Sequence, residues 1–226
     1  MPSVFITGAN RGIGLEFARQ YSNAGWQVVL ANRTPMAPKD FASLGMDVTE
    51  FHYDAMDDAT AADIAKRLKG RPIDVAILNA GIDDQPDLPP ELVTAEIWER
   101  AMLTNTFAPL HLAALLEPNL RIGQHKVLAA VSSLAASSTY TVPRQFAYRA
   151  SKASLNQMWR NLSVDWKDWG AICLTLRPGR VKTRMTGFEG DLTPSESVSG
   201  LRRVIETATP AESGKLWGYD GQVVPW

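Results

Sequence analysis

The stretch SVFITGANRGIGLEFARQY, residues 3–21, decides the fold of this chain, because it joins a strand pattern to a helix pattern through a glycine-rich loop. SVFIT is short, apolar and β-branched, whereas Ile13, Phe17 and Tyr21 recur at helical spacing. Between them, TGANRGIG (7–14) is typical of a loop that binds phosphate. Its glycines allow a tight turn and a close backbone approach, and the helix N-terminus offers free N–H groups. The alternative is an ordinary strand–helix turn, since glycine marks turns of every kind.

The rest of the chain repeats this alternation of short apolar and longer amphipathic runs. Strands are expected at 3–7, 26–33, 47–54, 73–81, 126–133 and 171–179, with an extended segment at 215–226. Helices are expected at 12–25, 59–68, 91–118 with a bend near Pro109, 145–167 and 195–208, and at most a short helix between 33 and 47, which carries Pro35 and Pro38. Alternating βαβ units predict an α/β fold. We expect a single Rossmann-type domain over 1–226, a doubly wound parallel sheet of about seven strands with helices on both faces.

Composition excludes several classes of protein. The 226 residues are 45% hydrophobic and 21% charged, and the formal net charge is −1. No run of Lys or Arg suggests a nucleic-acid or membrane partner. The first strand begins at Ser3, which leaves no room for a signal peptide, and no stretch reaches the roughly 20 apolar residues of a membrane span, so a cytoplasmic protein is expected. Cys173 lies in the apolar AICLTLRP and is interpreted as a packed thiol, while the three histidines lack metal-ligand spacing, so no metal is expected.

Tyr148 and Lys152 stand four residues apart in FAYRASKASLNQMW. On a helix this spacing places both side chains on one face. A lysine ammonium beside a phenol favours the phenolate, so the tyrosine pKa is expected to fall from its usual value of about 10. Such a tyrosine exchanges a proton with a carbonyl or alcohol oxygen. Together with a nucleotide loop the pair indicates hydride transfer, whereas taken alone it is also compatible with a solvated helix face.

Arg33 ends the second expected strand in LANR, where a carboxylate would bind the ribose 2′-hydroxyl of NAD. With Arg11 of the glycine loop, it is suited to holding a 2′-phosphate through charge-assisted hydrogen bonds. The pattern favours NADP(H) over NAD(H). A solvated arginine at a strand end is the alternative.

With these residues assembled, the chain resembles the short-chain dehydrogenase/reductase family over nearly its whole length. TGANRGIG fits the family's TGxxxGxG loop, NAG at 79–81 fits its NAG motif, and RPGRVKT (177–183) fits its PG segment. Asn105 in LTNTF, a serine in VSSLA, Tyr148 and Lys152 match the catalytic tetrad in order. The ending, LTPSESVSG and SGKLWGYDGQVVPW, is similar to the small reductases related to sniffer-type carbonyl reductases and bacterial C-factor-like proteins.

The resemblance implies a role for each matching residue. The implied catalytic residues are Asn105, Ser133, Tyr148 and Lys152. The implied cofactor contacts are Gly8, Asn10, Arg11, Gly12, Ile13, Gly14, Arg33, Asp54 (to adenine), Asn79, Ala80, Gly81, Tyr148, Lys152, Pro178, Gly179, Val181 and Thr183. Ser132 stays an alternative to Ser133, although the second serine of such a pair usually points inward in the family. Ser133 lies 15 residues before Tyr148, farther than the family's usual dozen, so a reshaped pocket loop is expected.

The expected function is an NADP(H)-dependent aldehyde, ketone or quinone reductase, with a small-molecule substrate as its partner. An NADP(H)-binding sensor or signalling protein on the same fold is the alternative, because fold alone does not define function. The expected pocket wall is 134–142 and 184–199, partly apolar through Tyr140, Met185 and Phe188, with a substrate loop at about 184–200. Tryptophans on the two long helices are compatible with a homodimer or with burial inside one subunit.

Overall fold

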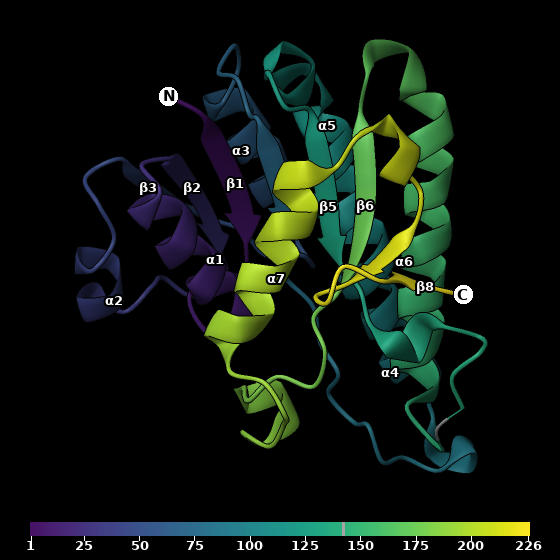
Figure 1. The fold of residues 1–226 in the computed structure, drawn as a ribbon. Helices are drawn as coiled ribbons and strands as arrows, with labels where there is room; N and C mark the ends of the chain where they lie inside the picture. Colours follow the sequence, from purple (N-terminus) through teal and green to yellow (C-terminus); the bar gives the residue numbers. More distant parts are fainter. Residues whose placement is uncertain (142) are drawn as a thin grey trace.

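A computed structural model describes residues 1–141 and 143–226 of the chain and shows one sheet covered by helices on both faces (Figure 1). The strands lie in the order β3-β2-β1-β4-β5-β6-β7-β8, all parallel to their neighbours except β8. They are β1 Ser3–Thr7, β2 Gln27–Asn32, β3 Val48–His52, β4 Val75–Leu78, β5 Val127–Val131, β6 Ile172–Arg177, β7 Leu216–Gly218 and β8 Val223–Val224. This order confirms the doubly wound Rossmann-type sheet, and its switch point lies between β1 and β4.

The helices agree with the predicted periodic segments. They are α1 Gly12–Asn23, α2 Pro38–Ala42, α3 Asp58–Arg67, α4 Ala95–Met102, α5 Ala108–Ile122, α6 Phe146–Asp165 and α7 Pro194–Thr207. The long helix expected over 91–118 is divided. A π-helical turn at Leu103–Phe107 separates α4 from α5, and Pro109 occupies the first turn of α5, where its missing N–H does no harm.

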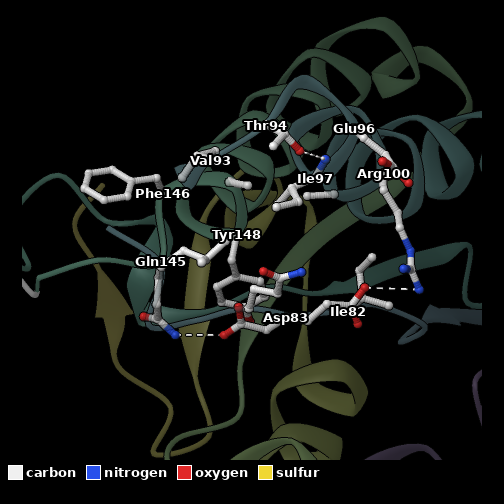
Figure 2. A pocket seen from close by; sticks show the side chains of 15 residues that line it. Ile82, Asp83, Val93, Thr94, Glu96, Ile97, Arg100, Gln145, Phe146 and Tyr148 are labelled. Carbon is white, nitrogen blue, oxygen red and sulfur yellow. Dashed lines mark hydrogen bonds and ion pairs between the residues drawn. The ribbon is translucent and has the colours of Figure 1, made fainter. Parts of the chain in front are cut away.

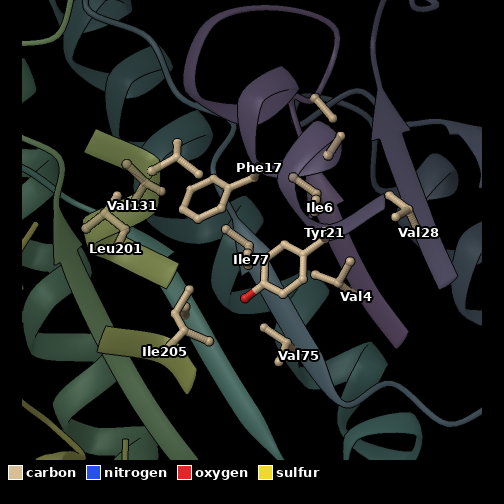
Figure 3. Close-up of a cluster of buried hydrophobic side chains, with 14 of the residues drawn as sticks. Val4, Ile6, Phe17, Tyr21, Val28, Val75, Ile77, Val131, Leu201 and Ile205 are labelled. Atoms are coloured by element: carbon tan, nitrogen blue, oxygen red, sulfur yellow. The ribbon is translucent and has the colours of Figure 1, made fainter. Parts of the chain in front are cut away.

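Two buried clusters hold the helices on the sheet. Side chains of β1 alternate between them: Val4 and Ile6 face α1 and α7, whereas Phe5 faces α3, α5 and α6. Figure 3 shows the first cluster, where Phe17 and Tyr21 of α1 lie against the strands together with side chains of α7. Parallel sheets need both faces covered. The two clusters meet this need and so hold the ends of the strands in place.

The C-terminal segment corrects the expected strand count. Residues 215–226 form two strands rather than one extended run, because the chain turns at Gly221 (φ +77°) and β8 pairs antiparallel with β7. The sheet therefore has eight strands. A glycine in this left-handed region costs no Cβ clash, which allows so tight a turn.

The tryptophans divide between core and surface. Trp159 is fully buried and Trp166 is buried, so they pack inside the subunit, whereas Trp98 on α4 is 43% exposed. Cys173 is fully buried, and burial raises the pKa of its thiol to about 12, which confirms the packed, unreactive thiol. The homodimer stays a prediction. Within the described residues no helix combines the length and apolarity required to cross a bilayer.

Candidate active site

The glycine loop occupies the switch point of the sheet. Gly8 has φ +65° and donates its N–H to the Ala31 carbonyl at 2.9 Å, which ties the loop to the end of β2. Gly14 lies so close to the start of the loop that an added Cβ would stand 2.2 Å from the Gly8 carbonyl oxygen. The glycines are therefore required for a close helix–loop contact, as their pattern predicted.

The first turn of α1 is built to receive an anion. Arg11 is the N-cap residue, but its side chain makes no capping hydrogen bond, and no acidic residue stands in the first turn. The N–H groups there thus lack a side-chain acceptor, and the helix dipole favours negative charge beside them. A Cβ added to Gly12 would meet nothing nearer than Thr183 at 3.5 Å, so space remains above the loop. These residues fit the pyrophosphate of a dinucleotide.

Asn32 is a structural residue of this loop that sequence reasoning missed. It is 1% exposed, and its Oδ1 accepts the Ala9 N–H at 2.6 Å while its Nδ2 donates to Glu50 at 2.7 Å. Glu50 also accepts the Met36 N–H at 2.8 Å. The sequence did carry a signal for Asn32, since a polar side chain at the last position of a buried strand needs hydrogen-bond partners.

Arg33 and Arg11 are both exposed on the side of the loop where a 2′-phosphate is expected. Asn10 joins their two segments, because its Nδ2 donates to the Thr34 carbonyl at 3.0 Å. Asp54 lies just after β3, and its Oδ1 accepts the Met56 N–H at 3.0 Å. Arg33 and Asp54 thus follow the ends of β2 and β3, at the same edge of the sheet as the glycine loop. Ile13 packs against the core beneath the loop.

The NAG segment after β4 is clamped to the glycine loop. The Asn79 side chain donates to the carbonyls of Thr7 and Gly8, both at 3.1 Å, and the Thr7 hydroxyl accepts the N–H groups of Asn79 and Ala80. A Cβ added to Gly81 would lie 3.3 Å from the Lys152 ammonium. The segment thus links the cofactor loop to the candidate catalytic lysine.

Tyr148 and Lys152 lie one turn apart on α6, with the lysine nitrogen 5.9 Å from the centre of the phenol ring. Lys152 is 4% exposed, and its ammonium donates to the Val131 carbonyl at 2.8 Å. Burial lowers the pKa of this ammonium from 10.5 to about 8, although the nearby Asp83 carboxylate opposes the shift. The expected helix and the shared face are confirmed.

The expected fall of the tyrosine pKa is wrong. Burial raises the pKa of Tyr148 to about 12, and the negative charge of Asp83 raises it further, while a hydrogen bond with Ser133 acts in the opposite direction. The physical reason is that the phenol is desolvated and the lysine charge is itself weakened by burial and bonded to a backbone carbonyl. Tyr148 therefore holds its proton at neutral pH.

The two serines after β5 point to different sides. Ser132 is 2% exposed, and its hydroxyl donates to Asn156 Oδ1 at 2.7 Å inside the protein. Ser133 lies near enough to Tyr148 to lower the pKa of the phenol, and its Oγ accepts the Ala135 N–H at 3.1 Å. The choice of Ser133 over Ser132 stays a prediction, which the internal hydrogen bond of Ser132 favours.

Asn105 lies in the π-helical turn and is fully buried. Its Oδ1 accepts the Ile82 N–H and its Nδ2 donates to the Ile82 carbonyl, both at 2.9 Å, and Nδ2 also donates to the Ser151 hydroxyl at 3.0 Å. Ser151 stands between Tyr148 and Lys152 on α6, so Asn105 couples that helix to the loop after β4. A π turn at such a junction is common at functional sites.

The PG segment closes the site from the end of β6. Gly179 has φ +81°, and the Pro178 carbonyl accepts the Ser197 hydroxyl at 2.7 Å. Val181 is 2% exposed and bridges to Leu192, which holds the following segment in place. Thr183 faces the glycine loop across the space above Gly12.

The cavity beside Tyr148 differs from the expected pocket. It has a volume of about 220 Å³ and is lined by the loop after β4, the start of α4 and the start of α6 (Figure 2). Neither 134–141 nor 184–199 lines it, and Val142 lies outside the described residues. Met185 and Phe188 are 55% and 69% exposed. The segment that bears them forms hydrogen bonds among its own residues. Arg180, near that segment, is paired with Glu189 at 3.2 Å.

Known proteins resemble the chain along most of its length. A family model described as short chain dehydrogenase matches residues 2–191. The C-signal of Myxococcus xanthus is 35% identical over 69% of this chain and 93% of its own length. A carbonyl reductase of Pseudomonas aeruginosa PAO1 in complex with NADP is 33% identical with a TM-score of 0.86 over the whole of both chains. The carbonyl reductase Sniffer of D. melanogaster is 27% identical with a TM-score of 0.90, again over both whole chains.

Proposed function

The chain belongs to the short-chain dehydrogenase family, and we propose that it is an NADP(H)-dependent reductase that converts an aldehyde, ketone or quinone carbonyl to an alcohol. The observation that carries the proposal is the meeting of Ser133, Tyr148 and Lys152 beside a cavity, at the same sheet edge as the glycine loop. A nicotinamide cofactor, when bound, supplies the hydride. The residues of the chain orient the substrate and handle the proton.

The substrate oxygen is held by two hydroxyl groups. Ser133 donates a hydrogen bond to the carbonyl oxygen and so polarises it. Tyr148 gives its phenolic proton to the same oxygen as negative charge develops there. A phenol whose pKa is about 12 carries its proton at neutral pH, so it has that proton to donate to the substrate oxygen.

Lys152 and Asn105 act on Tyr148, the proposed acid, rather than on the substrate. The Lys152 ammonium stabilises the phenolate left after proton transfer, because it is held 5.9 Å from the ring by its bond to the Val131 carbonyl. Asn105 fixes the loop after β4 against α6 through its three side-chain hydrogen bonds. We propose that from this position Asn105 links Lys152 to solvent and so helps to return a proton to Tyr148 after each turnover.

Exposed arginines support the choice of NADP(H). Arg33 and Arg11 are exposed cations that can make charge-assisted hydrogen bonds to a 2′-phosphate, and Arg33 stands where a carboxylate would otherwise repel it. The Pseudomonas aeruginosa carbonyl reductase was solved with NADP, which supports the same cofactor here.

The second candidate function is signalling or sensing on the same fold. The likeness to the C-signal of Myxococcus xanthus favours it. In that case the site would bind cofactor without turnover. The intact set of Ser133, Tyr148 and Lys152 favours the enzyme, because a sensor does not need a proton donor beside the cavity.

The deciding experiment follows NADPH consumption by the purified protein with a panel of aldehydes, ketones and quinones, alongside Tyr148→Phe. Loss of the phenolic proton is expected to lower turnover by about 10²–10⁴-fold, while NADPH binding, measured by fluorescence, stays close to that of the unaltered protein. Turnover that survives in Tyr148→Phe would refute the mechanism. Tight NADPH binding without any turnover across the panel would favour the sensor.

A further inference from the structure

The cavity beside Tyr148 carries an unbalanced negative charge. Three carboxylates line it, those of Asp83, Asp84 and Glu96, against the single guanidinium of Arg100. Arg100 is already paired with Asp84 at 3.1 Å. Glu96 is exposed at the rim, so its charge is largely screened by water. The charge that reaches the interior of the cavity is therefore that of Asp83.

Asp83 is half-buried and held in one orientation. Its Oδ2 accepts a hydrogen bond from Gln145 Nε2 at 2.8 Å, as Figure 2 shows beside the tyrosine ring. Gln145 is itself fixed, because its backbone N–H donates to the Pro86 carbonyl at 3.0 Å. No ion pair among residues 1–141 and 143–226 includes Asp83. The carboxylate thus keeps acceptor capacity that Gln145 does not use.

The field of Asp83 reaches the proposed reaction centre. Its negative charge favours the protonated forms of both Tyr148 and Lys152. It therefore acts to raise both pKa values, although burial lowers that of Lys152 overall. The Lys152 ammonium does not neutralise it by contact, because that ammonium donates to the Val131 carbonyl. A positive group on a bound substrate would meet a carboxylate close to the phenol that protonates the carbonyl.

Much of the remaining wall of the cavity is apolar, although Gln85 and Thr94 add polar groups. Leu88, Val93 and Ile97 line it, and Phe146, 41% exposed, stands at its edge. A partly apolar cavity with the oriented carboxylate of Asp83 in its interior is suited to an organic ammonium ion, whose carbon groups contact the walls while its N–H bonds the carboxylate. An aromatic ring such as that of Phe146 also attracts a cation over its face.

We propose that Asp83 makes this site selective for carbonyl substrates that carry a protonated amine, over neutral and anionic substrates of the same shape. The inference rests on the proposed reductase function, because it assigns the substrate class of that same site. Arg180, a cation that would instead favour an anionic substrate, is paired with Glu189 and lies outside the cavity lining.

Three aldehydes of matched shape test the proposal. They are 4-(dimethylaminomethyl)benzaldehyde, which is cationic at pH 7, its neutral isostere 4-isobutylbenzaldehyde, and the anionic 4-formylphenylacetate. The protein is expected to favour the cationic aldehyde over the neutral one by about tenfold or more in kcat/KM, which is the range that one charge-assisted hydrogen bond supplies. The anionic aldehyde is expected to be the poorest of the three.

Asp83→Asn and Asp87→Asn are the matched variants. Asparagine at 83 keeps an oxygen that accepts the Gln145 hydrogen bond but removes the charge, so the cationic preference should fall to within about threefold of unity. Asp87 lies on the same loop but does not line the cavity, so removing the same charge there should leave the ratio unchanged. An equal ratio in the unaltered protein and Asp83→Asn would overturn the proposal.

A binding measurement separates this inference from the proposed function. Saturation-transfer NMR with N,N-dimethylbenzylammonium and with phenylacetate needs no turnover. Binding of the ammonium ion that is lost in Asp83→Asn but kept in Asp87→Asn would support the charge selectivity even if no aldehyde were reduced. No detectable ammonium binding, or equal binding by both variants, would refute it whatever the reductase assay shows.

Discussion

Replacing Lys152 by methionine is expected to abolish turnover and yet to raise the free energy of unfolding at pH 7. The lysine is 4% exposed, and burial lowers the pKa of its ammonium from 10.5 to about 8 in the folded chain. Between these two values the unfolded chain binds more protons than the folded one, so stability rises with pH through that window. Below pH 8 the folded protein carries a buried charge that costs stability, and methionine removes that charge while filling similar space.

The size of the effect follows from the two pKa values and one hydrogen bond. A fall from 10.5 to about 8 corresponds to about 3 kcal/mol of destabilisation below pH 8. Methionine also loses the 2.8 Å bond from the ammonium to the Val131 carbonyl, at a cost of about 1–2 kcal/mol. The net gain at pH 7 is therefore about 1–2 kcal/mol, or about 2–6 °C in Tm for a chain of this length.

Thermal unfolding by circular dichroism at pH 7, 9 and 10.5, without cofactor, measures the gain. Lys152→Met should exceed the unaltered protein most at pH 7 and lose its advantage as pH approaches 10.5. Tyr148→Phe is the matched control, since it removes the proposed acid but keeps the ammonium, and its Tm difference should not follow this pH course. A less stable Lys152→Met at pH 7, or an advantage that stays constant up to pH 10.5, would refute the reasoning.

Four further substitutions distinguish the parts of the site. Ser133→Ala should lower turnover by about 10²-fold or more through the lost hydrogen bond to the substrate oxygen. Ser132→Ala should leave Asn156 without its buried partner and lower the free energy of unfolding by about 1–3 kcal/mol, as urea unfolding would show. If the two phenotypes were exchanged, the serine assignment would be wrong. Gly14→Ala would place a Cβ 2.2 Å from a backbone oxygen, so loss of folded protein or of NADPH binding is expected, and normal binding would contradict the loop geometry. Arg33→Asp should shift the NADPH/NADH ratio of kcat/KM toward NADH, whereas an unchanged ratio would mean that Arg33 does not contact the 2′-phosphate.

Local pattern predicted most of the architecture. The helical spacing of Ile13, Phe17 and Tyr21, and the apolar runs between helices, depend on near neighbours and were read directly from the chain. The π turn before Pro109 and the β7–β8 hairpin were missed. The π turn depends on contacts with distant segments, and the short strand β7 is held by its pairing with β6. The π turn in particular is held by the buried Asn105 side chain, which bonds the backbone of Ile82 and the hydroxyl of Ser151.

The sequence predicted which residues form the site better than it predicted their chemistry. Spacing placed Tyr148 and Lys152 on one face, but it carried no information about burial, so the direction of the tyrosine pKa was predicted wrongly. The cavity beside Tyr148 is lined by other segments than the expected pocket wall, which stays a prediction. Which loop approaches a strand end depends on how the helices pack, and the loop after β4 brings Asp83 there through its bond to Gln145.

The sequence by itself determined the doubly wound fold, the glycine loop and the tyrosine–lysine pair, because strand and helix periods and a four-residue separation are properties of adjacent residues. Only the tertiary structure decided the pKa values and neighbours of those groups: a phenol that keeps its proton, a lysine whose pKa falls to about 8, and a carboxylate at the cavity wall. Desolvation and Coulomb interactions act through space, so they depend on residues that the chain order keeps far apart.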